Sequence, residues 1–180
     1  MAVATGLTIE DYEALPEALA RGHELVKGEL IEVSGNIGRH NQLRFLIERA
    51  LAEYLEKRAL GGLVLSEQEY RFDEETTRAP DVSYFSEAKK RLYNPDRRVQ
   101  LFVPDLAIEI ASPNDRFGLV IDKLQLYLTA GVPEAWLFWP SMRAVFLCVT
   151  GRDPQPLQEF KPASVPGLSV PIGELFDRLV

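Results

Sequence analysis

The sequence predicts an α/β (α+β) fold in which helices flank a mixed β-sheet, with the middle elements in the order αβββαβ. Three observations predict it. Residues 39–58 place apolar side chains at the three-and-four spacing of an amphipathic helix, and residues 119–130 form a second helical segment. Three apolar runs of strand length separate the two helices. A further run follows the second helix.

The N-terminal part is predicted to contain a short helix and a β-hairpin before the first long helix. Thr8 is a good N-cap for the short helix, and Pro16 ends it. Residues 23–33 form two short runs around Lys27-Gly28, a pattern typical of a tight hairpin. The long helix then stops at Gly61-Gly62.

The centre of the sheet is predicted from three consecutive strands. They cover residues 63–72, 80–85 and 101–111. Pro104 divides the third run, because proline cannot donate a ladder hydrogen bond, and this leaves 105–111 as the regular part.

The C-terminal part continues with a helix, a hairpin and short additions. The helix at 119–130 ends at Gly131, with Pro133 close behind. The remaining elements are strands at 134–139 and 143–149, a Pro-rich loop or edge segment at 153–171, and a helical turn at 174–179.

Length and composition indicate an ordinary globular protein. Its 180 residues suit a single domain spanning 1–180, and 46% of them are hydrophobic. Cys148 is the only cysteine, which excludes an internal disulfide and a multi-cysteine zinc site. No apolar run is long enough to span a bilayer and no secretory signal is visible, so we expect a cytoplasmic protein with no membrane partner.

Charge is unevenly distributed along the chain. A net charge of -7 argues weakly against nucleic-acid binding, because duplex binding relies on Lys and Arg. One stretch nevertheless holds five cations and one acid. This stretch is either a solvated loop or a local anion-binding arm that contacts nucleic acid through Lys89, Lys90, Arg91, Arg97 and Arg98.

Two of the predicted strands each carry an acidic residue in an apolar run. Asp81 stands near the start of one strand, and Glu109 stands inside another between Ile108 and Ile110. Burying a carboxylate costs on the order of several kcal/mol of folding free energy unless the carboxylate is paired or coordinates a metal. Carboxylates on neighbouring strands can bind Mg²⁺ or Mn²⁺, and Lys123 on the next helix could orient an attacking water. These residues predict a metal-dependent hydrolytic site.

The ordered set of residues carries a family resemblance. Pro80-Asp81 followed by Glu109 resembles the PD-(D/E)xK nuclease superfamily, although Ala111 stands where the superfamily lysine usually does. The wider pattern resembles a bacterial family of putative restriction endonucleases, formerly a domain of unknown function, in which the lysine lies on the following helix. The matching segments are Glu24 to Leu30, His40, Pro80 to Val82, Glu109 to Pro113, Lys123 to Tyr127 and Gly131 to Trp136.

The sequence also departs from that family at two places. Leu119 stands where the family usually has an aspartate, four residues before the helix lysine. Trp139-Pro140 replaces an Asp-Pro pair. Neither change removes a proposed metal ligand, but both alter the surroundings that support the ligands.

The resemblance implies a restriction-endonuclease-like core with an N-terminal hairpin and C-terminal strand additions. It also implies an endonuclease that hydrolyses DNA with Mg²⁺ or Mn²⁺ held by Asp81, Glu109 and the Ile110 carbonyl. Glu24 could approach the same metal or pair with a surface cation. His40 could carry a proton, contact substrate, or simply cap or pack its helix.

Two other functions stay open at this level. A nuclease fold without activity could bind nucleic acid or a protein partner, and the acidic charge with Leu119 favours this reading modestly. An oligomeric scaffold would show an apolar interface at Trp136 or Trp139, with Lys123 in solvent. A homodimer would suit cleavage of a palindromic duplex, although the sequence shows no interface.

Overall fold

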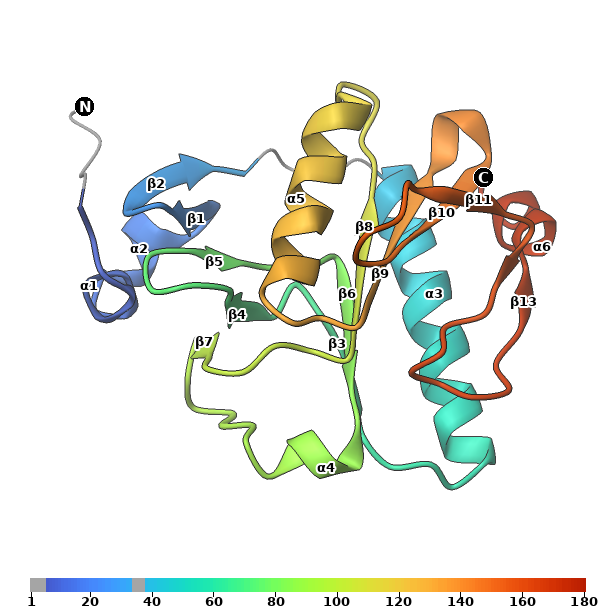
Figure 1. Cartoon of the computed structure of the whole chain (residues 1–180), viewed down its shortest axis with the longest axis horizontal. Coiled ribbons are helices and arrows are strands. Elements are labelled where there is room, and N and C mark those ends of the chain that lie inside the picture. Colours follow the sequence, from blue (N-terminus) through green and yellow to red (C-terminus); the bar gives the residue numbers. More distant parts are fainter. Residues whose placement is uncertain (1–5, 34–37) are drawn as a thin grey trace.

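The computed structural model describes residues 6–33 and 38–180. Its helices are α1 (Ile9–Glu13), α2 (Glu17–Ala20), α3 (Gly38–Lys57), α4 (Glu87–Lys90), α5 (Phe117–Thr129) and α6 (Ile172–Asp177), with a 3-10 turn at Pro140–Met142. Its strands are β1 (His23–Val26), β2 (Glu29–Glu32), β3 (Leu63–Ser66), β4 (Glu69–Arg71), β5 (Thr77–Arg78), β6 (Val82–Phe85), β7 (Val99–Gln100), β8 (Leu106–Ile110), β9 (Glu134–Trp139), β10 (Ala144–Cys148), β11 (Gln155–Leu157), β12 (Glu159–Phe160) and β13 (Val170–Pro171). Figure 1 shows their arrangement.

A six-stranded mixed sheet forms the centre of the structure, in the order β11-β10-β9-β8-β6-β3. Only β8 and β9 are parallel neighbours, and α5 provides the crossover that a parallel pair requires. The other neighbours are antiparallel. The predicted fold class is confirmed, because helices pack on a mixed sheet in the order α3-β3-β6-β8-α5-β9.

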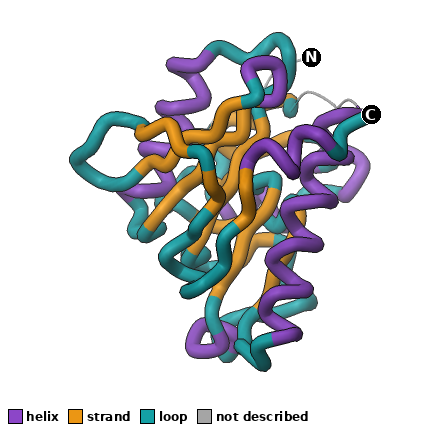
Figure 2. Tube along the Cα trace, turned by 90° about the vertical axis from the view of Figure 1, so that its right-hand side faces the viewer, coloured by secondary structure: helices purple, strands orange, loops and turns teal. Residues whose placement is uncertain are grey.

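The sheet is buried on both faces, each by one long helix (Figure 1). Figure 2 shows α3 lying along the strands on one side. Ile108 and Ile110 of β8 belong to the core cluster that α3 covers. Ala107 and Ala111 belong to the cluster that α5 covers. Successive strand residues point to opposite faces, so Glu109 lies on the α5 face between these two alanines.

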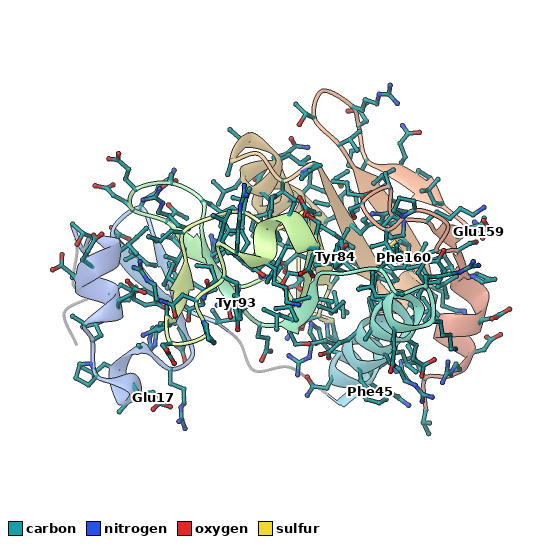
Figure 3. The ribbon with its side chains drawn as sticks, turned by 90° about the horizontal axis from the view of Figure 1, so that it is seen from below. Glu17, Phe45, Tyr84, Tyr93, Glu159 and Phe160 are labelled. Carbon is teal, nitrogen blue, oxygen red and sulfur yellow. The ribbon has the colours of Figure 1, made fainter. Side chains whose placement is uncertain are left out.

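The α3 helix has one side packed against the core and one side exposed to solvent. Phe160 of β12 is fully buried against the same cluster, whereas Phe45 of α3 is 58% exposed. Figure 3 shows the two phenylalanines on opposite sides of the helix. The predicted helix at residues 39–58 is therefore amphipathic as expected, beginning one residue earlier and ending one residue earlier.

A smaller part packs beside the sheet (Figure 1, left). The predicted hairpin is present as β1 and β2, which pair in register from His23–Glu32 to Val26–Glu29. Strands β5, β4 and β7 form a separate three-stranded sheet. Tyr12, Leu25 and Val99 are fully buried between these elements. This arrangement brings Glu24 and Arg78 toward the start of β6.

One predicted strand is wrong, and two other predictions for the sheet hold. The single strand expected at 63–72 is broken, because Glu67 has a positive φ of 52° that turns β4 away from β3 and into the other sheet. The regular strand expected at 105–111, after Pro104, is present as β8 and is one residue shorter at each end. The segment at 153–171, expected as a loop or edge segment, contains β11 at the edge of the large sheet and the short pair β12 and β13. Within the described residues, no helix is long and apolar enough to cross a membrane.

Candidate active site

Asp81 stands immediately before β6, opposite Glu109 if the β6–β8 register is continued by one residue. Its Oδ2 accepts a 2.7 Å hydrogen bond from the backbone N–H of Ile110 and lies 3.2 Å from Nε2 of His40. Its Oδ1 receives no hydrogen bond from any residue that the structure describes. One carboxylate oxygen is thus fixed by the protein, and the other is available to a ligand.

Glu109 is 7% exposed and faces α5. The Nζ of Lys123 lies 2.9 Å from its carboxylate, and the hydroxyl of Tyr127 donates to Oε1 at 2.6 Å. Burial raises the pKa of Glu109 to about 7, and the charge of Asp81 adds to this rise while Lys123 opposes it. The expectation that Glu109 is buried and partnered, not solvent-facing, agrees with this placement.

Lys123 lies between two carboxylates. Besides Glu109 it approaches Oε1 of Glu24 at 3.8 Å. Burial alone would lower the pKa of Lys123, but the negative charges of Glu109, Glu24 and Asp81 together raise it above its ordinary value. The side chain therefore carries its positive charge at neutral pH.

Glu24 ties the hairpin to the segment that leads into Asp81. Its Oε2 accepts a 2.6 Å hydrogen bond from Arg78, and its Oε1 accepts a 2.9 Å bond from the backbone N–H of Ala79. Arg78 and Ala79 directly precede Pro80-Asp81, so Glu24 fixes the backbone there. These two bonds give Glu24 an organising role in the structure.

His40 is 3% exposed and lies in the first turn of α3. With Nε2 beside Asp81, its Nδ1 is buried without a hydrogen-bond partner among the described residues. Because a carboxylate oxygen only accepts, Nε2 of His40 is the donor in this contact. His40 therefore contacts the cluster instead of only capping the helix.

Two residues of this cluster were not predicted. Tyr127 lies at the apolar stripe of α5, where a packing role is the ordinary interpretation, but its hydroxyl also donates to Glu109. The available signal was its position four residues after Lys123, which places both on one helix face. Arg78 had no recognisable signal, because its partner Glu24 is 54 residues away in the chain.

A cleft of about 1060 Å³ opens over these side chains. Glu24, His40, Asp81, Glu109, Ile110 and Lys123 all line it. The structure thus brings together every residue that the sequence predicted for catalysis or metal binding. The roles themselves stay predictions.

The five predicted nucleic-acid contacts are not brought together. Only Arg98 lines the cleft, where it pairs with Glu69 at 3.1 Å and lies over the ring of Tyr12. Lys89 pairs with Asp105 at 2.7 Å, Arg97 with Glu13 at 2.5 Å and Lys90 with Glu87 at 3.4 Å. Arg91 is exposed at the end of α4. Since α4 follows β6 and Asp81 precedes it, the proposed arm begins at the far end of that strand.

The donor atoms fit a hard divalent cation. Within residues 6–33 and 38–180, no group of three or more His, Cys, Asp and Glu side chains is placed to hold a metal. The site instead offers Asp81, Glu109 and the backbone carbonyl of Ile110, all oxygen donors at the cleft. Mg²⁺ usually binds through one or two carboxylates and keeps several waters. Asp81 and Glu109 therefore supply enough carboxylates for a Mg²⁺ site of this kind.

The features expected of a scaffold differ from what is observed. Trp136 is fully buried, packs edge-on against Phe160, and donates to Glu134 at 3.2 Å. Lys123 is turned into the acidic cluster and away from solvent. Cys148 is buried, and burial raises the pKa of its thiol to about 11, as expected for a core residue.

Comparisons with known proteins identify the fold and the family of this chain. A relative called "Uncharacterized protein sll1609", from Synechocystis sp. (strain ATCC 27184 / PCC 6803 / Kazusa), is 29% identical over 139 residues, which is 71% of this chain and 77% of the relative. A crystal structure described as a putative nuclease belonging to DUF820, from Anabaena variabilis ATCC 29413, matches with a TM-score of 0.82 at 21% identity. The match covers 97% of this chain and 99% of that one, and shows the same fold.

A family model described as "Uma2: Putative restriction endonuclease" matches residues 9–173. The match includes Glu24, His40, Asp81, Glu109 and Lys123. The chain therefore belongs to this family, and its restriction-endonuclease-like fold is consistent with the PD-(D/E)xK superfamily.

Proposed function

We propose that this protein is a Mg²⁺- or Mn²⁺-dependent endonuclease that hydrolyses phosphodiester bonds of DNA. The observation that carries the proposal is the convergence of Asp81, Glu109 and Lys123 in one cleft, although they come from three separate elements. A buried set of two carboxylates and one ammonium group is costly to build for stability alone. Family membership supports the same reaction class.

Asp81, Glu109 and the Ile110 carbonyl would hold the cation. When bound, the cation supplies charge stabilisation at the scissile phosphate and lowers the pKa of water. The protein prepares Asp81 for this by fixing Oδ2 with the Ile110 N–H and His40, while Oδ1 accepts no hydrogen bond from the described residues. Tyr127 donates to Oε1 of Glu109 and Lys123 donates to Oε2, which fixes the orientation of this second carboxylate.

Lys123 acts as a cation in this proposal and not as a general base. Its raised pKa keeps the ammonium protonated at neutral pH, so its N–H groups can orient the attacking water and offset negative charge on the phosphate. Glu24 adds a second negative charge beside Lys123, with its Oε1 3.8 Å from Nζ. Glu24 and His40 are thus positioning residues that act through Lys123 and Asp81.

The test compares two aspartate substitutions that preserve shape. Asp81→Asn removes a proposed ligand, whereas Asp105→Asn changes a partly buried aspartate that pairs with Lys89 outside the cleft. We expect Asp81→Asn to abolish Mn²⁺ binding in calorimetry and to lower duplex DNA cleavage at least ~100-fold. We expect Asp105→Asn to retain both activities at a temperature where it is folded.

Unchanged metal binding and cleavage in Asp81→Asn would overturn the proposal. A wild type that binds DNA but neither binds Mn²⁺ nor cleaves would instead identify an inactive nuclease-fold module. A specific observation favours keeping this second candidate, since every carboxylate near the cation site already has a partner within the protein.

A further inference from the structure

The charges that line the cleft do not favour a polyanion. Eight carboxylates line it, against six Lys or Arg side chains. The cations are Arg21, Arg44, Arg78, Arg98, Arg116 and Lys123. Unpaired positive charge is what nucleic-acid backbones bind most strongly. A cation in the cleft therefore attracts a phosphate best when no carboxylate of the protein is paired with it.

Five of the six are ion-paired within the chain. Their partners are Glu17 for Arg21, Glu67 for Arg44, Glu24 for Arg78, Glu69 for Arg98, and Glu109 with Glu24 for Lys123. A phosphate that approaches one of these cations also meets the negative charge of its partner. At about 4 Å that repulsion is of the same order as the attraction to the cation.

Arg116 differs from the other five. It is exposed, lines the cleft, and forms no ion pair or hydrogen bond through its side chain among the described residues. Its neighbour Asp115 forms no ion pair with it among the described residues, and Oδ2 of Asp115 instead accepts a 2.6 Å bond from the backbone N–H of Ser112. Arg116 therefore offers a complete guanidinium fork to a ligand in the cleft.

The position of Arg116 indicates which part of a ligand it can meet. It directly precedes α5, and Lys123 lies seven residues later on the same helix. At 1.5 Å per residue the two positions are about 10 Å apart along the axis. One strand of B-DNA carries a phosphate every ~3.4 Å of its axis, so this spacing corresponds to about three nucleotides.

We propose that Arg116 binds a backbone phosphate about three nucleotides from the scissile one, so that the cleft selects an extended nucleic-acid strand over a small phosphodiester. The inference rests on the proposed function and adds a substrate-binding residue to it. It also replaces the arm at residues 89–98, since the one cation of that arm in the cleft, Arg98, is already paired.

Arg91 provides a matched control. It too is an exposed arginine without an ion pair or side-chain hydrogen bond among the described residues, but it does not line the cleft. It stands at the end of α4, at the lower edge of Figure 1, whereas α5 begins at the upper edge. Arg91→Ala and Arg116→Ala remove the same charge from opposite ends of the molecule.

The experiment measures binding and cleavage separately. A labelled 20-base-pair duplex is titrated by fluorescence anisotropy with Ca²⁺, another cation with oxygen ligands, over a series of salt concentrations. We expect Arg116→Ala to weaken binding about tenfold and to lower the slope of log K against log salt by about 0.9, the value for one phosphate contact. Arg116→Lys should keep the slope, and Arg91→Ala should match the wild type.

Two outcomes would overturn the role of Arg116. Equal losses in Arg116→Ala and Arg91→Ala would show only a general effect of net charge. Wild-type binding in Arg116→Ala, with the wild type still cleaving in Mg²⁺, would leave the proposed function standing and remove this inference. A wild type that neither binds the duplex nor cleaves it overturns both.

Discussion

At the scale of single residues, the site depends on side chains that hold other side chains. Tyr127 is fully buried and its ring stacks on Phe72 with centroids 4.4 Å apart. Burial, and then the charge of Glu109, raise its pKa well above the ordinary value, so its hydroxyl remains a donor to Glu109. Tyr127 thus combines packing with orientation of a proposed metal ligand.

Tyr127→Phe keeps the stacked ring and is expected to weaken Mn²⁺ binding about tenfold. Removing a hydrogen-bond partner of a metal ligand usually lowers metal affinity by roughly 10–100-fold. Tyr70→Phe is the control, since Tyr70 is equally buried and its hydroxyl bonds Ser83 at 2.8 Å outside the cleft. Calorimetry should show the loss in Tyr127→Phe alone. Equal metal affinity in the two variants would reduce Tyr127 to a packing residue.

At the scale of elements, the connections decide where the ligands stand. Gly62 links α3 to β3 with a φ of 109°, and a Cβ built there would lie 2.4 Å from the carbonyl oxygen of Phe85. Phe85 ends β6, the strand that Asp81 precedes. The glycine therefore permits close contact between β3 and the strand that places the first acid. Gly118, inside α5, has no atom within 4 Å of its built Cβ.

These two glycines are expected to respond to alanine in opposite directions. Gly62→Ala should lower the free energy of unfolding by about 2 kcal/mol or more, because it combines a clash with backbone and an unfavourable positive φ. Gly118→Ala should raise it by roughly 0.5–1 kcal/mol, the difference in helix propensity. Urea unfolding of both variants tests the pair. A stable Gly62→Ala protein would contradict the close approach of the strands.

At the scale of the whole molecule, the sheet brings distant parts of the chain to one cleft. β6 and β8 are neighbours at its centre, α5 covers one face, and the hairpin β1–β2 reaches over the strand ends. This arrangement buries Glu109 beside Asp81. Placing two acids together costs folding free energy unless one is protonated or a cation binds.

Without metal, the titration of Glu109 is expected to lower the free energy of unfolding as the pH rises from 5 to 8. The pKa of Glu109 is about 7 in the folded protein, against an ordinary value of 4.5. At pH values between these two pKa values the folded state therefore holds more protons than the unfolded state. Unfolding then releases a proton, which makes the folded state less stable as pH rises, by on the order of 2–3 kcal/mol at most. The groups that face Glu109 are Asp81, Lys123 and Tyr127.

Glu109→Gln isolates this contribution, because the amide does not titrate. Urea unfolding in EDTA at pH 5 and pH 8 should show the variant gaining stability relative to the wild type at the higher pH. Parallel profiles for the two proteins would mean that Glu109 is ionised throughout this range.

Much of the site could be predicted because its residues follow local patterns. Asp81 and Glu109 stand out as acids in apolar runs, and Lys123 follows on the next helix. Tyr127 and Arg78 were missed for different reasons. Tyr127 matches the apolar stripe of its helix, and Arg78 depends on a pairing with Glu24 across 54 residues. The break at Glu67 was missed because its flanking residues alone favour a continuous strand.

The sequence by itself determined the order of the elements, the α/β class and the set of acids and lysine, because hydrophobic periodicity and buried charge are local properties. The tertiary structure decided which charges meet. Arg98 is paired with Glu69, whereas Arg116 lines the cleft without an ion-pair partner in the described part of the chain. Such pairings depend on how strands and helices pack across long separations, and the free energy of a charge depends on its surroundings more than on its neighbours in the chain.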